Sequence, residues 1–366
     1  MTQEAFDLLA LSLVPGLGTR RCHALLSRLG FPSEILKLSR RKLRELGLPT
    51  EAQYAISTGQ CRREAEEAAE RIRRAGGCIL GYFDSDYPPR LKQIFDPPLA
   101  LYWIGSKSEL LQHCVSVVGT RRPSCYGTQI ATRLARELAE LGLTIVSGMA
   151  RGIDSRAHRG ALEAHGRTIA VLGTGADVPY PRENRKLYRQ IIENGCVISE
   201  FPPGSHPAPQ NFPIRNRIIS GLSFGVLIPE AAEFSGSLIT ARLSLEQDRD
   251  VWAVPGNITN PGSYGPNFLI RQGAKPILSV QDLLEELPLE ILNQLRADAA
   301  GAPERKPFEP EETAVLEAMT EGDSVHFDEL LCQTDQTAGR LNYVLMNLEM
   351  KGAVEVLPGR RYMRRL

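Results

Sequence analysis

Six short runs of aliphatic and β-branched residues recur through the middle of the chain, each separated from the next by enough sequence for a helix. Within a run the apolar residues are continuous rather than alternating, as in strands buried on both faces of a parallel sheet. Strands that alternate with helices indicate an α/β fold with a doubly wound, Rossmann-like parallel sheet. The predicted strands are VSVVG (115–119), LTIVSG (143–148), TIAVLG (168–173), CVISE (196–200), FGVLIPE (224–230) and DVWAVPG (250–256).

Residues 1–75 have no strand pattern, because Leu, Ala, Arg and Glu recur there at helical spacing. The segment LVPGLGTRRCHALLSRLG predicts two helices joined by a Gly16-x-Gly18 hairpin, with Thr19 capping the second helix. This all-α domain resembles a SAM or helix-hairpin-helix unit, whose open backbone amides can hold a DNA phosphate. We favour a structural role, in which the glycines permit a tight turn. Residues 20–75 carry 13 Lys and Arg against 7 Asp and Glu, so DNA contact stays an alternative.

Prolines and mixed charge mark residues 288–307 as a linker between an α/β domain at 78–287 and a C-terminal domain at 308–366. The C-terminal pattern of helix, short helix, longer helix and hairpin predicts a winged helix. This domain has 6 Lys and Arg against 11 Asp and Glu, the wrong charge for a DNA reader, so we favour a protein-contact or packing role. The opposing observation is a basic cluster on the wing at Arg360, Arg361, Arg364 and Arg365.

Composition narrows the class of protein. The 366 residues include 43 basic and 43 acidic side chains, which argues against coating nucleic acid through a global field. No apolar stretch reaches the ~18 to 20 residues that cross a bilayer, and the N-terminus lacks the cationic region of a signal peptide. The 7 cysteines form no CxxC pair and no zinc-ligand pattern with histidines. We expect a cytoplasmic protein with reduced thiols, no metal and no membrane attachment.

In a doubly wound sheet, ligands bind outside the carboxyl ends of the strands. Here the loops at those ends carry glycines, hydroxyl groups and cations, which together bind anions. The donors expected are the loop and helix-start residues Gly119, Thr120, Ser124, Ser235, Gly236 and Ser237, and the cations are Arg121, Arg215 and Arg217. A phosphate is expected to rest on the Gly119 and Thr120 amides beside Arg121.

Phe212 lies between cations in the loop after the fourth predicted strand, where an exposed ring can stack on an unpaired base. Because the bases of a duplex are already stacked, phosphate donors beside such a ring favour single-stranded nucleic acid. Turn chemistry or buried packing explains any one loop equally well. Five loops that converge on one edge favour binding.

The sequence lacks the motifs of common enzymes with this type of sheet. The pair Gly173-x-Gly175 is followed three residues later by Val178, where a dinucleotide-binding fingerprint needs glycine. Neither GxxxxGK[ST] nor GxSxG occurs. We therefore predict no catalytic residue and no cofactor.

The strand-end loops, taken in order across about 115–280, resemble the DNA-processing protein A family (DprA, also called Smf). The segments are VVGTRRPSCYG, IVSGMARGIDSRAHRGAL, TIAVLGTGADVPYPRENRKL, ISEFPPG, NFPIRNRIISGLS and SGSLITARLSLEQDRDVWAVPG. The resemblance implies a protein that is not an enzyme, binds single-stranded DNA and forms a homodimer through its Rossmann-like domain. It also implies that the protein loads RecA recombinase onto incoming strands during natural transformation.

The resemblance also implies individual roles. The arginine of the family's GTR motif falls on Arg121, a phosphate contact, and the turn around it matches at Gly119, Thr120 and Ser124. The family's FPxRNR segment falls on Phe212, Arg215, Asn216 and Arg217. Asn216 would position the loop or a phosphate through its amide, and Lys186 would add a further phosphate contact.

Two other functions remain open from the sequence. The related lysine-decarboxylase-like phosphoribohydrolases use a PGGxGTxxE loop, whose glutamate acts at the sugar of a nucleotide. Here the matching loop is EFSGSLITARL, which keeps a phosphate cradle but has no carboxylate at the matching place. Glu230 and Glu233 precede the loop and leave a nucleotide-processing enzyme as the alternative. A scaffold for a recombinase that does not use the DNA edge is the third possibility.

Overall fold

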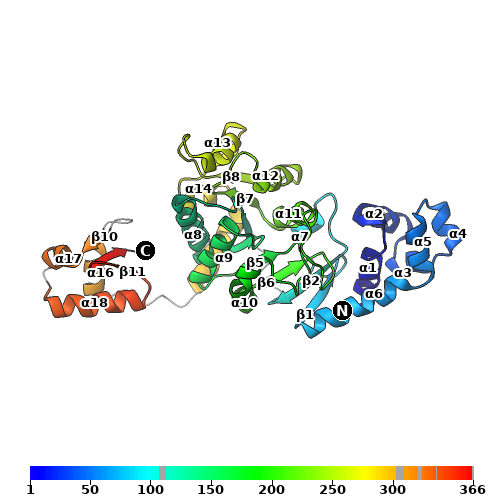
Figure 1. Ribbon diagram of the computed structural model, residues 1–366, viewed down its shortest axis with the longest axis horizontal. Coiled ribbons are helices and arrows are strands. Elements are labelled where there is room, and N and C mark those ends of the chain that lie inside the picture. Colours follow the sequence, from blue (N-terminus) through cyan, green and yellow to red (C-terminus); the bar gives the residue numbers. More distant parts are fainter. Residues whose placement is uncertain (107–112, 302–308, 320–323, 335, 365–366) are drawn as a thin grey trace. The chain divides into compact units, whose positions relative to one another are not determined.

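The structure is a computed structural model that describes residues 1–106, 113–301, 309–319, 324–334 and 336–364 (Figure 1). Its contacts divide the chain into two compact units, Met1–Ala300 and Gly301–Leu366. In the part of the chain that the structure describes, no helix is long and apolar enough to span a bilayer.

A nine-stranded sheet forms the centre of the first unit, in the order β1-β2-β6-β5-β4-β3-β7-β8-β9. The six predicted strands pair in parallel and are buried along almost their whole length, which confirms the doubly wound fold. They are β3 (Cys114–Val117), β4 (Thr144–Ser147), β5 (Thr168–Val171), β6 (Cys196–Ser199), β7 (Gly225–Ile228) and β8 (Asp250–Ala253).

Three strands were not expected from the pattern. β1 (Gly77–Gly81) and β2 (Ala100–Gly105) pair antiparallel with each other, and β2 pairs antiparallel with β6. β9 (Lys275–Pro276) adds a parallel edge beside β8. These strands lie outside the repeating strand and helix alternation, and β9 is a two-residue exposed segment with a proline, so no apolar run marks it.

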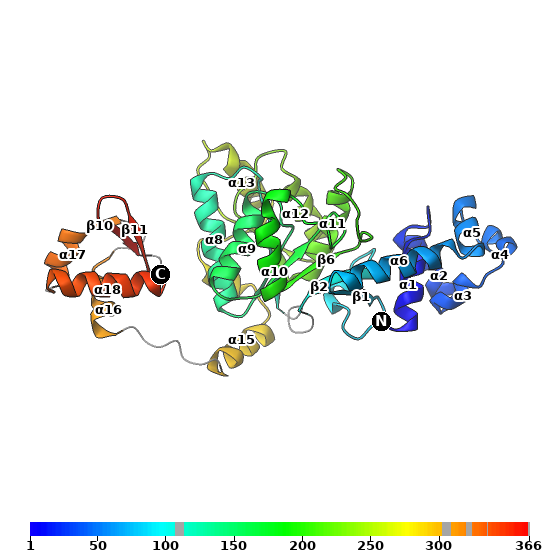
Figure 2. The ribbon, with the colours of Figure 1, turned by 60° about the horizontal axis from the view of Figure 1, so that its bottom comes forward.

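Helices cover both faces of the sheet, and Figure 2 shows α8, α9 and α10 side by side on one face. This face is covered by α8 (Cys125–Glu140), α9 (Ile153–Glu163), α10 (Arg185–Asn194) and α14 (Val280–Glu285). The other face is covered by α7 (Pro89–Lys92), α11 (Asn211–Leu222), α12 (Gly236–Glu246) and α13 (Tyr264–Arg271). Short 3₁₀ helices precede α10 and α13, at Arg182–Asn184 and Pro261–Ser263.

The order of the strands creates a switch point between β3 and β7. From β3 the chain proceeds through β4, β5 and β6 toward one edge of the sheet, and then it returns to β7 on the other side of β3. The loops after β3 and β7 therefore leave the same edge in opposite directions. A crevice at this place is the usual ligand site of a doubly wound sheet.

The N-terminal region is all-α, as predicted. Its helices are α1 (Gln3–Ser12), α2 (Gly18–Leu29), α3 (Pro32–Leu36), α4 (Arg40–Glu45), α5 (Thr50–Ser57) and α6 (Gln60–Arg74). Gly16 and Gly18 have φ of 68° and 66°, so the turn between α1 and α2 does use left-handed backbone. The prediction that Thr19 caps α2 is wrong, because the helix begins one residue earlier and the Thr19 hydroxyl donates to Glu200 Oε1 at 3.4 Å.

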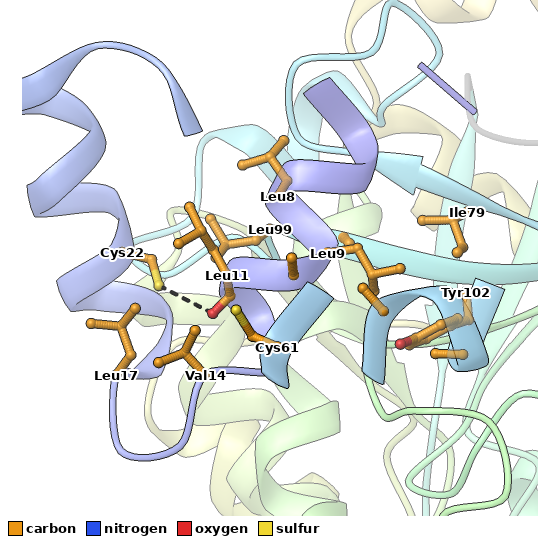
Figure 3. Packing of buried hydrophobic residues seen from close by; sticks show 14 of the residues in the cluster. Leu8, Leu9, Leu11, Val14, Leu17, Cys22, Cys61, Ile79, Leu99 and Tyr102 are labelled. Carbon is orange, nitrogen blue, oxygen red and sulfur yellow. Dashed lines mark hydrogen bonds between the residues drawn. The ribbon is translucent and has the colours of Figure 1, made fainter. Parts of the chain in front are cut away.

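The helical region shares one hydrophobic core with the sheet. Figure 3 shows Leu8, Leu9 and Leu11 of α1 beside Leu99 and the strand residues Ile79 and Tyr102, all part of one buried cluster. The core therefore continues across the predicted boundary between residues 75 and 78. Burial also raises the pKa of the Cys22 thiol in this cluster to about 12, and its Sγ contacts the Leu11 carbonyl at 3.9 Å.

The second unit has the element order of a winged helix, and it includes one strand that was not predicted, β10. It contains α16 (Pro310–Glu317), β10 (Ser324–His326), α17 (Phe327–Thr334), α18 (Ala338–Met350), β11 (Val354–Leu357) and β12 (Arg361–Arg364). Its sheet has the order β10-β12-β11. Both cations of the third helix region are paired: Arg340 with Glu311 and Lys351 with Glu312, each at 2.6 Å. These pairs favour the packing role over DNA reading. Arg365 lies outside the described residues.

The predicted linker at 288–307 is in part helical, because α15 (Leu289–Gly301) occupies its first half. Residues 302–307 lie outside the described part of the chain. Leu295 is buried against the same cluster as α8 and α9, so the start of this segment packs on the first unit.

The shared core predicts that the helical region and the sheet unfold together. The chain has 2 tryptophans, and both, Trp103 of β2 and Trp252 of β8, lie in the sheet, so their fluorescence reports sheet unfolding. Truncation of a fully buried leucine costs about 2 to 5 kcal/mol. We expect Leu9→Ala in α1 to lower the denaturant midpoint seen by these tryptophans. The exposed-site control Leu245→Ala should leave it unchanged, and an unshifted midpoint for Leu9→Ala would show that the regions unfold independently.

Candidate nucleic-acid interface

A cleft of about 1230 Å³ opens at the switch point, over the carboxyl ends of β3 and β7. Its walls come from the loop after β3, the start of α11, the loop before α12 and the segment before α13. Ten of the predicted binding residues line it: Gly119, Thr120, Arg121, Ser124, Phe212, Arg215, Asn216, Ser235, Gly236 and Ser237. Lys186, which is exposed on α10, and Arg217 are not among the lining residues.

One wall of the cleft combines aromatic rings with a cation. The guanidinium carbon of Arg121 lies 5.7 Å from the centre of the Phe212 ring. The centre of the Tyr180 ring lies 5.6 Å from the centre of the Phe212 ring. Gly173 packs against Phe212, because a Cβ atom there would lie 2.9 Å from the ring. Asn211 Nδ2 donates to the Gly173 carbonyl at 3.1 Å, which fixes the start of α11. The half-buried Phe212 ring is thus held in place beside an exposed arginine.

Arg121 is a cation of this wall whose charge is not paired with a carboxylate among the described residues. It is exposed in the loop after β3, and none of the ion pairs between described residues includes it. An exposed guanidinium beside an aromatic ring can bind a phosphate while the ring contacts the base of the same or the next nucleotide.

The backbone amides around Arg121 are already occupied. The Thr120 N–H donates to the Glu230 carbonyl at 2.8 Å, and the Gly119 N–H donates to the Asp154 carboxylate. The Ser124 N–H donates to Glu230 Oε2 at 2.8 Å. The expectation that a phosphate rests on the Gly119 and Thr120 amides is therefore wrong, since each amide has an internal acceptor. The Arg121 side chain remains exposed at this place.

Arg215 is buried, with 4% of its surface exposed, although it borders the cleft. Its Nη1 donates to the Gly148 carbonyl at 2.8 Å and to the Val171 carbonyl, which ties the ends of β4 and β5 to α11. Burial lowers the pKa of Arg215 to about 10, partly offset by Asp154, and burial raises the pKa of Asp154. Gly148 must be a glycine, because a Cβ atom there would collide with the guanidinium. Arg215 holds the site together rather than offering a free charge.

Arg217 is also an internal cation. Its Nη2 donates to both carboxylate oxygens of Glu200 at 2.7 Å, and its Nε lies 3.4 Å from Asp96 Oδ2. Burial raises the pKa of Glu200, an effect that Arg217 opposes. The Thr19 hydroxyl contacts the same carboxylate, so the network joins α11, β6 and the N-terminal hairpin. The geometry gives no support to the phosphate contact predicted for Arg217, because its charge is already paired.

Another part of the cleft lining comes from the loop before α12. Ser235 caps this helix: the Ser237 N–H donates to Ser235 Oγ at 3.4 Å, and the two hydroxyl oxygens are 2.8 Å apart. The sequence reasoning missed two aromatic residues of the cleft lining, Phe234 and Tyr264. Phe234 gave a signal, as an aromatic residue in a polar loop, whereas Tyr264 is the first residue of α13, and only the folded chain brings both to the same cleft as Phe212.

The acidic residues at the cleft have different environments. Glu230 is 3% exposed, and its carboxylate accepts from Ser124 N and from Asn260 Nδ2, the latter at 3.3 Å. Glu233 is exposed at the rim. The Glu230 carboxylate therefore holds the turn that leads into α8, whose N-cap is Ser124.

The contrast between internal and free arginines is testable by stability. Leaving a buried polar group without its hydrogen-bond partner typically costs about 1 to 3 kcal/mol. We expect Arg215→Ala to lower the free energy of unfolding by at least this amount, measured by urea denaturation, because it leaves the Gly148 and Val171 carbonyls without their donor. Arg121→Ala, the matched control on the same cleft, should change it by less than about 0.5 kcal/mol. Equal losses for the two variants would contradict the assignment.

Comparisons with known proteins agree with one another. The family model for DNA recombination-mediator protein A matches residues 78–288, and the model for the DprA winged helix domain matches residues 284–360. The DNA processing protein DprA of Bacillus subtilis is 47% identical over 203 residues, which cover 55% of this chain and 68% of that protein. Protein Smf of Escherichia coli is 42% identical over 280 residues, which cover 75% of this chain and 74% of that protein.

Two solved structures are similar as well. The X-ray structure of DNA processing protein A from Streptococcus pneumoniae has a TM-score of 0.70 and 35% identity, and the match covers 79% of this chain and 99% of that one. DNA processing protein A from Helicobacter pylori, a structure concerned with its single-stranded DNA binding mode, has a TM-score of 0.52 and 34% identity over 61% of this chain and 96% of that one. Because the family model spans more than half of its length, the chain belongs to the DNA recombination-mediator protein A family, whose members are also named DprA and Smf.

Proposed function

We propose that this protein binds single-stranded DNA in the switch-point cleft and loads RecA recombinase onto the bound strand during natural transformation. The observation that carries the DNA-binding part is the pairing of Arg121 with Phe212, a free cation beside a fixed, half-buried ring. Both parts of a nucleotide, the phosphate and the base, have a partner there.

The ring favours a single strand over a duplex. Stacking of a base on an aromatic side chain contributes about 1 to 3 kcal/mol, and only an unpaired, unstacked base can reach Phe212. Phosphate and stacking contacts read no base edges, so the proposed binding has weak sequence preference. Asn216 lines the same cleft one turn after Phe212 and accepts from Arg215 Nε at 3.2 Å, which leaves its amide nitrogen for a phosphate.

The relatives support this proposal. DNA processing protein A from Helicobacter pylori has a single-stranded DNA binding mode, and it shares 34% of its aligned residues with this chain. RecA loading, a homodimer formed through the Rossmann-like domain and a cytoplasmic location are further parts of the proposal, and they rest on the family alone. We assign no individual residues to the dimer or RecA surfaces.

A nucleotide-processing enzyme is less well supported. Glu230 is buried, and its carboxylate already accepts hydrogen bonds from the Ser124 N–H and from Asn260 Nδ2, which supports a structural role for this residue of the cleft lining. We therefore propose a binding protein without catalytic activity of its own. For the winged helix, the ion pairs of Arg340 and Lys351 with α16 support a packing or protein-contact role.

The binding site is tested by fluorescence anisotropy with single-stranded and double-stranded oligonucleotides of equal length at two salt concentrations. We expect Phe212→Ala to weaken single-strand binding about 5- to 150-fold, the equivalent of about 1 to 3 kcal/mol. Arg121→Ala should weaken it and reduce the slope of log affinity against log salt by about 0.7, the value for one phosphate contact on a single strand.

The matched control is Arg242→Ala, an exposed arginine of α12 that pairs with Glu246 and does not line the cleft. It should bind like wild type. Lys186→Ala tests the predicted contact that lies outside the cleft. Binding that survives both Arg121→Ala and Phe212→Ala would move the DNA site to the N-terminal hairpin or the wing, and absence of any binding would overturn the proposed function.

RecA loading is tested separately. We expect the wild-type protein to shorten the lag of RecA's DNA-dependent ATPase on single-stranded DNA, because it delivers RecA to a strand that it already holds. Arg121→Ala should lose this effect and Arg242→Ala should keep it. If Arg121→Ala shortens the lag as well as wild type does, loading does not depend on DNA held in this cleft.

A further inference from the structure

Phe234 is the most exposed aromatic side chain that lines the cleft. Its residue surface is 93% exposed, and the residue lies in the cleft lining, in the loop before α12. Among the described residues, its ring has no aromatic or cationic partner. An exposed ring alone is ordinary for a protein surface, but this ring borders the cleft, where a bound base could cover it.

The loop that carries Phe234 is held at both ends. The Ala231 N–H donates to the Gly262 carbonyl and the Ala231 carbonyl accepts from the Gly265 N–H, both at 2.8 Å. The Ser235 N–H donates back to the Ala232 carbonyl at 3.0 Å, which closes a tight turn around Phe234. The ring therefore stands on a fixed turn rather than on a loose loop.

The surroundings of Phe234 suit a neutral base better than a phosphate. Its neighbour Glu233 carries an exposed carboxylate at the cleft, which repels an anion but not the flat face of a base. The exposed cations of the cleft, Arg121 and Arg122, lie in the loop after β3 and not in the loop of Phe234. The phosphates of a bound strand would contact the arginines, and its bases would contact the aromatic rings.

The surroundings also fit a protein partner less well. Polar residues, among them Ser235, Ser237 and Asn260, border this cleft together with apolar ones, and a protein contact at the Phe234 ring would bury these polar groups with it. A nucleotide needs both kinds of group, since it presents an apolar face beside polar edges and a phosphate.

We infer that Phe234 is a second base-stacking platform, which receives a different base of the strand from the one held by Phe212. The inference rests on the proposed function, single-strand binding in this cleft. Tyr264 also lines the cleft; it is 44% exposed, and its ring is stacked on that of Phe268 with 6.1 Å between the ring centres. The cleft thus offers a strand two aromatic platforms, Phe212 and Phe234, and exposed arginines for its phosphates.

The experiment measures binding of wild type and variants to single-stranded DNA by anisotropy. We expect Phe234→Ala to weaken binding about 5- to 150-fold, the range for one stacked base. Its salt slope should stay at the wild-type value, because no phosphate contact is lost, whereas Arg121→Ala lowers the slope. Phe234→Tyr should retain binding and Phe234→Leu should not, since only an aromatic ring stacks. On an oligonucleotide without bases, Phe234→Ala should bind like wild type.

A spectroscopic readout follows from the natural tryptophans. Trp103 and Trp252 are 1% and 0% exposed, so they contribute a constant background when DNA binds. Phe234→Trp should give a new emission that single-stranded DNA quenches by stacking. Leu278→Trp, at a residue that is 76% exposed and outside the cleft, is the matched control and should not be quenched.

Three outcomes overturn the inference in distinguishable ways. Single-strand binding that is lost in Phe212→Ala but unchanged in Phe234→Ala, with no quenching of Phe234→Trp, removes the second platform and leaves the proposed function intact. A wild-type protein that binds no single-stranded DNA removes both. If Phe234→Ala changes the oligomeric state and not DNA affinity, the ring serves a protein contact and the inference is wrong.

Discussion

The buried contact between Arg215 and the ends of β4 and β5 is the interaction on which the rest of the site depends. One guanidinium satisfies the carbonyls of Gly148 and Val171 and faces the buried carboxylate of Asp154. Asp154 in turn accepts from the Gly119 and Gly148 amides. The loops after β3 and β4 are therefore ordered by backbone hydrogen bonds to these two buried groups, whose opposite charges offset part of the cost of burial. The exposed position of Arg121 follows from that order.

Helix α11 separates two roles along one short segment. Phe212 and Asn216, four residues apart, both line the cleft, as the helical repeat requires. Arg215 and Arg217 are buried and bind strand-end carbonyls and the Glu200 carboxylate instead. The aromatic platform is thus fixed to the sheet by its own helix, which gives a bound base a rigid surface. Through Glu200, the same helix also reaches Thr19 of the N-terminal region.

The strand-end glycines serve packing more than anion binding. Gly148 makes room for the Arg215 guanidinium, and Gly173 makes room for the Phe212 ring. The amides of Gly119, Thr120 and Ser124 already have acceptors within the protein. The contacts proposed for Arg121 and Phe212 are side-chain contacts, and they read no base edges. That division is consistent with a mediator that must accept any incoming strand.

The sequence by itself determined the six parallel strands, the all-α start, the winged-helix order and the family, because continuous apolar runs and consecutive loop motifs are local features. It also identified the cleft edge, since parallel strands place their carboxyl ends together. It could not separate Arg121 from Arg215 and Arg217. Their difference depends on Asp154, Glu200 and Asp96, which come from distant segments. Only the tertiary structure decided which arginine is paired and that Phe234 faces the cleft, because burial and pairing are properties of the packed chain and not of the residue.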